Sequence, residues 1–180
     1  MDSRISSHAQ NAFGNFALAA NTIGVRNNAF GYNALNVNTI GIDNNAFGYY
    51  ALKANTTGSY NVAIGNRSLR SNTIGTNNTA VGHDSLFTNT TGSNNVGIGK
   101  RAGQTISSGS QNTIIGTNAD VAVNNLSNAT AIGYGANVAA SNTIQLGNTS
   151  VTNVKTSGTL TAGSVTYPNT DGTNGYYLKT

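Results

Sequence analysis

Hydrophobic residues in this chain occur in short runs that end at glycine and recur at a fixed spacing. Segments such as NNAFG, NVAIG, NTAVG and NTIIG place β-forming residues at alternate positions. A run of four or five residues of this kind, closed by a tight turn, is typical of a short β-strand. The apolar residue before the glycine recurs at every seventeenth position, at Phe13, Phe30, Phe47, Ile64, Val81, Ile98, Ile115 and Ile132.

Two series of glycines share this period. The first comprises Gly14, Gly31, Gly48, Gly65, Gly82, Gly99, Gly116 and Gly133, and the second comprises Gly24, Gly41, Gly58, Gly75, Gly92 and Gly109. Each glycine inside a helix would cost about 1 kcal/mol relative to alanine, so helical repeats are disfavoured. We predict an all-β fold, a parallel β-solenoid of 17-residue coils, in which equivalent residues stack about 4.8 Å apart. The glycines are expected at corners with positive φ.

Leucine and asparagine columns complete the repeat. The leucines are Leu18, Leu35, Leu52, Leu69 and Leu86, and one asparagine column is Asn27, Asn44, Asn61, Asn78, Asn95 and Asn112. A second asparagine column comprises Asn21, Asn38, Asn55, Asn72 and Asn89. We expect the leucines and the Phe/Ile/Val residues before the first glycines to form a thin, dry interior. The asparagines are expected at corners, bonded to their own turns and to their equivalents in adjacent coils, although a ligand-binding role is an alternative.

A column of small residues lies between the apolar positions of each strand: Ala12, Ala29, Ala46, Ala63, Ala80 and Gly97. We expect this column to point out of the coil, where small side chains would permit close approach of another copy. The alternative is a tightly packed position within one chain. Assembly itself is expected because a thin rod has much surface for its volume.

Composition excludes several classes of function. The chain of 180 residues has no cysteine, so it has neither a disulfide framework nor thiolate metal ligands. No stretch approaches the roughly 18 apolar residues of a spanning helix, so membrane insertion is not expected. The net charge is +4, with nine basic residues scattered singly or in pairs. Nucleic acid is therefore not expected as a partner.

Catalytic chemistry is also not expected. Glutamate is absent and the five aspartates are 36 or more residues apart, which leaves no evident carboxylate pair. His83 and Asp84 are adjacent in sequence, so their side chains are expected to diverge. We predict that the chain is not an enzyme and holds no cofactor or metal. Acids and bases do fall in register, with Arg26 and Asp43 in one column and Arg67, Asp84 and Arg101 in another, which would help to set the stacking.

Five residues are candidates for ligand binding. Tyr32 and Tyr49 follow glycines of the first series and Tyr50 comes one place later, where aromatic rings could stack on sugars of a cell-surface glycan. The alternative is that these rings cover the edge of the coil or meet a neighbouring chain. Lys53 and Arg70 are separated by one full period, so they stack like charges. These two cations would repel one another unless they splay into water or meet an anion or another chain.

The period shortens near the C-terminus, where ATAIGYGANVAASNTIQLGN places Gly147 only fourteen positions after Gly133. This segment resembles the head repeats of trimeric autotransporter adhesins, the YadA-like heads, and the following NTSVTNVKTSGTLTAG is similar to their neck. The 17-residue units, such as NTAVGHDSLFTNTTGSN, also resemble arrays in phage tail-fibre proteins. The resemblance implies a left-handed β-roll and a homotrimer.

These observations divide the chain into five parts. They are an N-terminal tail (1–10), regular 17-residue repeats (11–103), degenerate repeats resembling a YadA-like head (104–147), a neck-like segment (148–163) and a linker toward a distal module that the sequence does not include (164–180).

The expected function is the shaft or head of a homotrimeric virion appendage, such as a phage tail fibre involved in host attachment. Its expected partners are a cell-surface glycan or protein receptor and other fibre or virion proteins. One alternative is the passenger of a bacterial trimeric autotransporter adhesin, on the bacterial outer surface. Another is an ice-binding solenoid, suggested by the column Thr22, Thr39, Thr56, Thr73 and Thr90.

Overall fold

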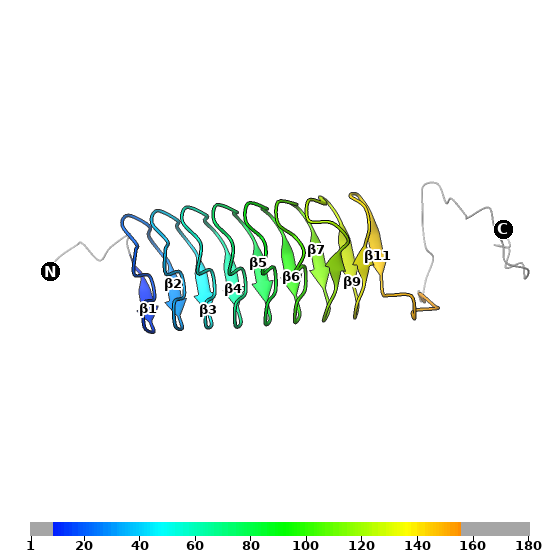
Figure 1. The fold of residues 1–180 in the computed structure, drawn as a ribbon, viewed down its shortest axis with the longest axis horizontal. Helices are drawn as coiled ribbons and strands as arrows, with labels where there is room; N and C mark the ends of the chain where they lie inside the picture. Colours follow the sequence, from blue (N-terminus) through cyan, green and yellow to red (C-terminus); the bar gives the residue numbers. More distant parts are fainter. Residues whose placement is uncertain (1–8, 156–180) are drawn as a thin grey trace, which may run out of the picture.

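The chain winds into a rod of stacked coils, each contributing one short strand to a continuous sheet (Figure 1). The structure is a computed structural model and describes residues 9–155. The linker predicted for 164–180, most of the tail predicted for 1–10 and half of the neck-like segment predicted for 148–163 therefore lie outside the described residues. The predicted parallel β-solenoid is confirmed.

Within residues 9–155, nine strands form the main sheet in the order β1-β2-β3-β4-β5-β6-β7-β9-β11, and every pair is parallel. Two shorter strands, β8 and β10, form a separate parallel pair. The bounds are β1 Asn11–Phe13, β2 Asn28–Phe30, β3 Asn45–Phe47, β4 Val62–Ile64, β5 Thr79–Val81, β6 Val96–Ile98, β7 Thr113–Ile115, β8 Asp120–Val121, β9 Thr130–Ile132, β10 Asn137–Val138 and β11 Ile144–Leu146.

Strand register fixes the length of each coil. Ala46 pairs with Ala63 and Ile114 with Ala131, so the 17-residue spacing persists through β9 although the consensus weakens from Gln104. The last pair joins Ile144 to Thr130, a step of only fourteen positions. The predicted shortening of the coil is therefore confirmed, and it occurs at this step.

The strand faces are the reverse of the prediction. The middle residue of the strands points inward, so Ala46 and Ala63 are fully buried, whereas Phe47 is 39% and Ile64 43% exposed. Where a leucine fills the coil, the interior has little room at the middle position: a Cβ on Gly97 would lie only 2.7 Å from Leu86 Cγ. The predictions of a Phe/Ile ladder inside and an alanine column outside were wrong, because the leucine column already fills the coil.

Leucine provides most of the predicted interior. Leu35, Leu52, Leu69 and Leu86 are fully buried, although Leu52 adopts a left-handed φ of 50°. Where the column becomes Gly103, the alanine column becomes Ile114, which is also fully buried. A Cβ on Gly103 would lie 3.6 Å from Ile114 Cγ1. The larger isoleucine thus fills the space that the lost leucine leaves, which keeps the packing dense as the consensus changes.

The two glycine series serve different purposes. The first has φ values between +117° and +148°, and a Cβ on Gly48 would lie 2.3 Å from the carbonyl oxygen of Gly65. The second series was also expected at positive φ, and this was wrong. A Cβ on Gly41 would instead lie 2.3 Å from the oxygen of Gly58 and 2.4 Å from Asn38 Oδ1. Glycine is needed there for close stacking.

Both asparagine columns are buried ladders along the rod. Asn44 donates its backbone N–H to Asn27 Oδ1 (3.0 Å) and its Nδ2 to the carbonyl of Gly58 (2.8 Å). In the second column Asn38 Nδ2 donates to Asn21 Oδ1 (2.8 Å) and to the carbonyl of Gly41 (3.1 Å). The bonds to the turns and to equivalent residues are those expected from the sequence, and they satisfy the polar groups that tight corners bury.

Candidate functional site

The outer face of the main sheet carries a continuous apolar ladder. The third residues of the strands pair in register along the rod: Phe13, Phe30, Phe47, Ile64, Val81, Ile98, Ile115, Ile132 and Leu146. Phe30 and Phe47 stack with ring centroids 4.9 Å apart and planes within 5°. We call these nine residues the apolar ladder. A row of this length on one chain is an exposed surface of the kind that marks a protein interface.

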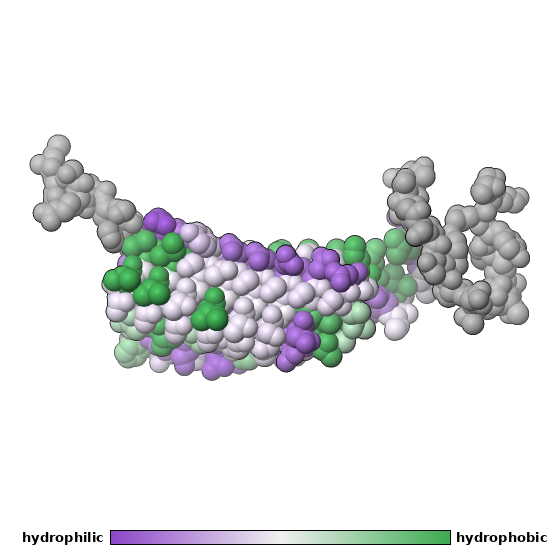
Figure 2. Space-filling view, turned by 90° about the horizontal axis from the view of Figure 1, so that it is seen from above, coloured by the Kyte–Doolittle hydropathy of each residue, from purple (hydrophilic) through white to green (hydrophobic). Residues whose placement is uncertain are grey.

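Another side of the rod has a different character. Figure 2 shows a mostly pale surface of intermediate hydropathy, with small apolar patches toward the ends, one isolated patch between them and a hydrophilic row along one edge. The continuous apolar character therefore belongs to the strand face rather than to the whole surface.

The five candidate binding residues form one aromatic and cationic cluster. Tyr32 stacks on Tyr49 with centroids 5.4 Å apart, and Tyr49 lies 4.0 Å from Tyr50. Lys53 Nζ lies 4.6 Å and Arg70 Cζ 5.7 Å from the centroid of the Tyr50 ring. The sequence placed these residues in three columns, and the structure brings them together because Tyr50 reaches the cations of its own coil and of the next.

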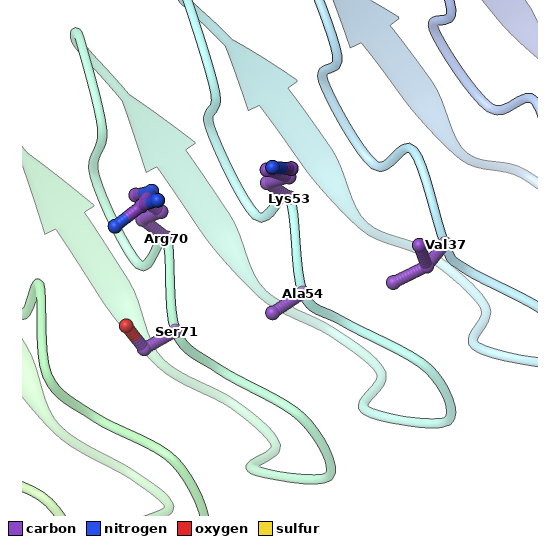
Figure 3. A pocket seen from close by; sticks show the side chains of 5 residues that line it. All are labelled: Val37, Lys53, Ala54, Arg70 and Ser71. Atoms are coloured by element: carbon purple, nitrogen blue, oxygen red, sulfur yellow. The ribbon is translucent and has the colours of Figure 1, made fainter.

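Lys53 and Arg70 line a surface groove. They project side by side from equivalent places in successive coils, with Ala54 and Ser71 beside them and Val37 in the coil before (Figure 3). The cavity has a volume of about 360 Å³ and opens to solvent. Val37, Ala54 and Ser71 were missed by sequence reasoning, although their 17-residue spacing and their position next to the cation column were a usable signal.

Arg70 has an unusual environment within this groove. Its guanidinium lies near two rings, with Cζ 5.7 Å from the centroid of Tyr50 and 5.4 Å from that of Phe87. Its Nε is buried and has no hydrogen-bond partner within residues 9–155. Phe87 was also missed from the sequence, although it continues the column of Lys53 and Arg70.

The Tyr49 hydroxyl does not balance this positive charge. The interaction of Tyr49 with the Tyr50 hydroxyl, assisted by burial, raises the pKa of Tyr49 above its ordinary value of 10.0. Tyr49 is therefore neutral near pH 7 and cannot serve as a counter-ion for either cation.

Two other arginines of the rod are paired with acids as the register predicted, whereas Arg101, one coil beyond Asp84, forms no ion pair among the described residues. Arg26 Nε and Nη2 donate to the two carboxylate oxygens of Asp43 at 2.7 and 2.6 Å. This pairing lowers the pKa of Asp43 below its ordinary value and raises that of Arg26. Arg67 binds Asp84 in the same bidentate way, at 2.8 and 2.6 Å. Among the described residues, Lys53 and Arg70 form no such pair with an acid.

Two aspartates outside the groove, Asp84 and Asp120, make contacts that belong to the structure of the rod. His83 Nδ1 lies 3.1 Å from Asp84 Oδ2, so the prediction that their side chains diverge was wrong; the left-handed φ of Asp84, 57°, turns the carboxylate toward its neighbour. Burial raises the pKa of Asp120, which accepts a hydrogen bond from Thr105 Oγ1 at 2.8 Å. Both carboxylates serve contacts between or within coils.

The threonine hydroxyls donate hydrogen bonds to carbonyl groups of the next coil. Thr39 Oγ1 donates to the carbonyl of Thr56 at 3.0 Å, and Thr56 Oγ1 to that of Thr73 at 3.1 Å. These bonds tie successive coils together, and they do not favour a surface that offers its hydroxyl protons to ice.

Residues 9–155 contain neither a group of three or more metal-ligating side chains nor a helix long and apolar enough to cross a membrane. Comparisons with known proteins add no relative, since neither a family model nor a curated protein matches the chain.

Proposed function

We propose that this chain is one of three identical subunits of a rigid fibre, the shaft or head of a virion appendage that takes part in attachment to a host cell. The single observation that carries the proposal is the apolar ladder along the strand face. The repeats that resemble phage tail-fibre arrays and YadA-like heads supply the number three, the left hand of the coil and the setting on a virion.

The apolar ladder supports assembly through its composition and its continuity. Phe30, Phe47, Ile64, Ile98 and Ile132 are between 37% and 43% exposed. The sheet holds each residue at a fixed position along the rod. A partner surface can therefore bury the whole row together, with little loss of conformational freedom. At about 25 cal/mol per Å² of apolar surface removed from water, such a row contributes substantially to association. This interface replaces the alanine face expected from the sequence.

Attachment would depend on the rigidity of the fibre and on the number of binding sites that it presents. Three rods fixed side by side would present each surface site three times in one body. Weak contacts to a repeated receptor on a cell, a glycan or a protein, would then add by avidity. This mechanism asks for no catalytic group.

The oligomer is tested with two lysine substitutions of exposed isoleucines. Ile64 lies in the ladder and is 43% exposed, whereas Ile74 is 53% exposed and lies outside the strands. Light scattering should give a mass near three times 18.4 kDa for the unmodified chain and for Ile74→Lys. Ile64→Lys should lower the mass to that of one chain. A monodisperse monomer for the unmodified chain would refute the assembly.

The location of the protein on a virion is tested separately, with antibodies against this chain and electron microscopy of virions and of bacterial cells. Labelling of a virion appendage supports the proposal. Labelling confined to the bacterial outer surface would refute it and favour an adhesin passenger. Binding of the purified trimer to host cells, measured by fluorescence, tests attachment itself.

A further inference from the structure

We propose that the groove between Lys53 and Arg70 binds the acidic group of a sugar, a carboxylate or a sulfate, in a cell-surface polysaccharide. The inference rests on the proposed role in attachment and names the class of ligand and the site that would hold it. Three independent features of the groove carry it.

The first feature is an unbalanced pair of charges. Two other arginines of the rod each stack on an acid one coil away, Arg26 on Asp43 and Arg67 on Asp84. Lys53 and Arg70 occupy equivalent positions in adjacent coils and carry the same charge, with no acid paired to either among the described residues. Like charges at stacked positions destabilise a sheet-like array. An anion between the two would turn this repulsion into attraction.

The second feature is the unused donor of Arg70. Its Nε is buried and has no acceptor within residues 9–155, and a buried donor without a partner is costly. The two aromatic rings beside the guanidinium, Tyr50 and Phe87, constrain its orientation. A guanidinium fork matches the paired oxygens of a carboxylate or sulfate, so such an anion would supply the acceptor that Nε lacks once the side chain turns toward the groove.

The third feature is the shape and lining of the groove. Its volume of about 360 Å³ falls within the range of small-ligand sites, and it is open, as a site for one unit of a long polymer must be. Val37 and Ala54 offer apolar surface and Ser71 a hydroxyl beside the cations. A sugar ring needs this combination, because it has apolar C–H faces and a polar rim.

The adjacent tyrosines favour a sugar over an isolated inorganic anion. Tyr32 and Tyr49 are 39% and 44% exposed and stack along the rod beside Tyr50. The exposed edges of these rings can contact the C–H groups of the neighbouring sugar units. The two cations are too few for a nucleic acid backbone, which proteins track with longer basic stripes.

The test measures binding of three defined polymers to the full-length protein by isothermal titration calorimetry. Fragments of polygalacturonate carry carboxylates, dextran sulfate carries sulfates, and dextran is neutral. We expect binding of at least one acidic polymer and none of dextran. The acidic polymer that binds identifies which group the groove takes. Binding of neither acidic polymer overturns the proposal.

Matched variants locate the site. Lys53→Gln with Arg70→Gln removes two charges from the groove, and Lys100→Gln with Arg101→Gln removes two exposed charges elsewhere. The groove variant should weaken binding by about tenfold or more, and the control should stay within about twofold. Equal weakening in both variants would mean attraction to net charge alone and would overturn the proposal.

A third variant separates the ring from the charges. Asparagine is chosen for Tyr50→Asn because Asn33, one coil earlier in the same column, already adopts a left-handed φ of 54°, close to the 58° of Tyr50. The variant should weaken binding without changing the net charge. Unchanged affinity in this variant would overturn the role of the aromatic ring. Light scattering and a thermal melt of each variant show that the fold is retained. If the protein is a trimer but binds no acidic sugar, only the proposed binding site is refuted. If it is a monomer that binds an acidic sugar, only the proposed fibre is refuted.

Discussion

Replacing Asn61 with alanine tests whether the asparagine ladder is structural. Asn61 is fully buried and its side chain takes part in four hydrogen bonds. Its Nδ2 donates to Asn44 Oδ1 and to the carbonyl of Gly75, and its Oδ1 accepts from the backbone and side-chain N–H groups of Asn78. The ladder therefore passes through this residue in both directions along the rod.

The cost of Asn61→Ala can be worked out from the partners left behind. Asn44 Oδ1 still accepts from the Asn61 backbone N–H, and the Gly75 carbonyl still accepts from Asn72 Nδ2. Asn78 Nδ2 still donates to the carbonyl of Gly92. The Asn78 backbone N–H alone loses its acceptor. One buried donor left without an acceptor costs about 1–3 kcal/mol, and the other lost bonds add to it. The free energy of unfolding should therefore fall by about 3 kcal/mol.

Urea denaturation followed by circular dichroism measures this difference, and Asn66→Ala provides the control. Asn66 lies five residues further along the same coil and is exposed, so its replacement should change the free energy of unfolding by less than about 0.5 kcal/mol. If Asn61→Ala were no more destabilising than Asn66→Ala, the ladder would not hold the coils together. A role in binding a ligand would then be the better account of the column.

Three further outcomes follow from the geometry. Gly48→Ala should destabilise the fold by more than about 2 kcal/mol, because the new Cβ would lie 2.3 Å from a backbone oxygen of the next coil; a thermal melt measures the loss. Ala63→Leu should cost at least about 1–3 kcal/mol by overpacking, whereas Ile64→Leu on the outer face should be nearly neutral in the same assay. Because Arg26 lowers the pKa of Asp43, this carboxyl stabilises the fold fully above its ordinary pKa of 3.8 and loses that contribution as the pH falls through the lower folded value. Asp43→Asn should remove this part of the acid dependence, measured by urea denaturation between pH 2 and pH 5, and an unchanged acid profile would contradict it.

The coil length and its register could be predicted from the sequence because every structural demand recurs once per coil. Gly31 and Gly48 must both avoid a Cβ for the same reason, and Asn27 and Asn44 must both bridge to the next coil. When the same residue type is needed at the same position of every coil, that residue type recurs in the sequence once per coil length. The register of Arg26 with Asp43 was readable for the same reason.

The direction of the strand faces could not be predicted from alternation alone. A three-residue strand has one inward position, and its period of two is the same whichever face is buried. The usual preference for large apolar residues inside selected Phe47 rather than Ala46, which was wrong. A better signal was present: the inward position is occupied by alanine or glycine from Ala29 to Gly97, whereas the outward position varies among phenylalanine, isoleucine and valine.

The candidate binding cluster could be predicted only in part. The repeat placed Lys53 beside Arg70 because they hold the same position in successive units. The contact of both cations with Tyr50 depends on how that side chain leaves a corner with a φ of 58°, which no column reveals. The unpartnered Nε of Arg70 likewise depends on the packing of Phe87, a residue of the next coil.

The narrow core and the apolar exterior have one physical cause. A coil with room for a single leucine layer, such as Leu52, leaves space for only a methyl group across from it, so the bulky residues of each strand must face outward. A single rod cannot bury Phe47 or Ile64 by any rearrangement that keeps its coils, because the interior is already full. Only another surface can cover them. The solenoid that makes the rod thin is therefore also what makes its strand face suited to assembly.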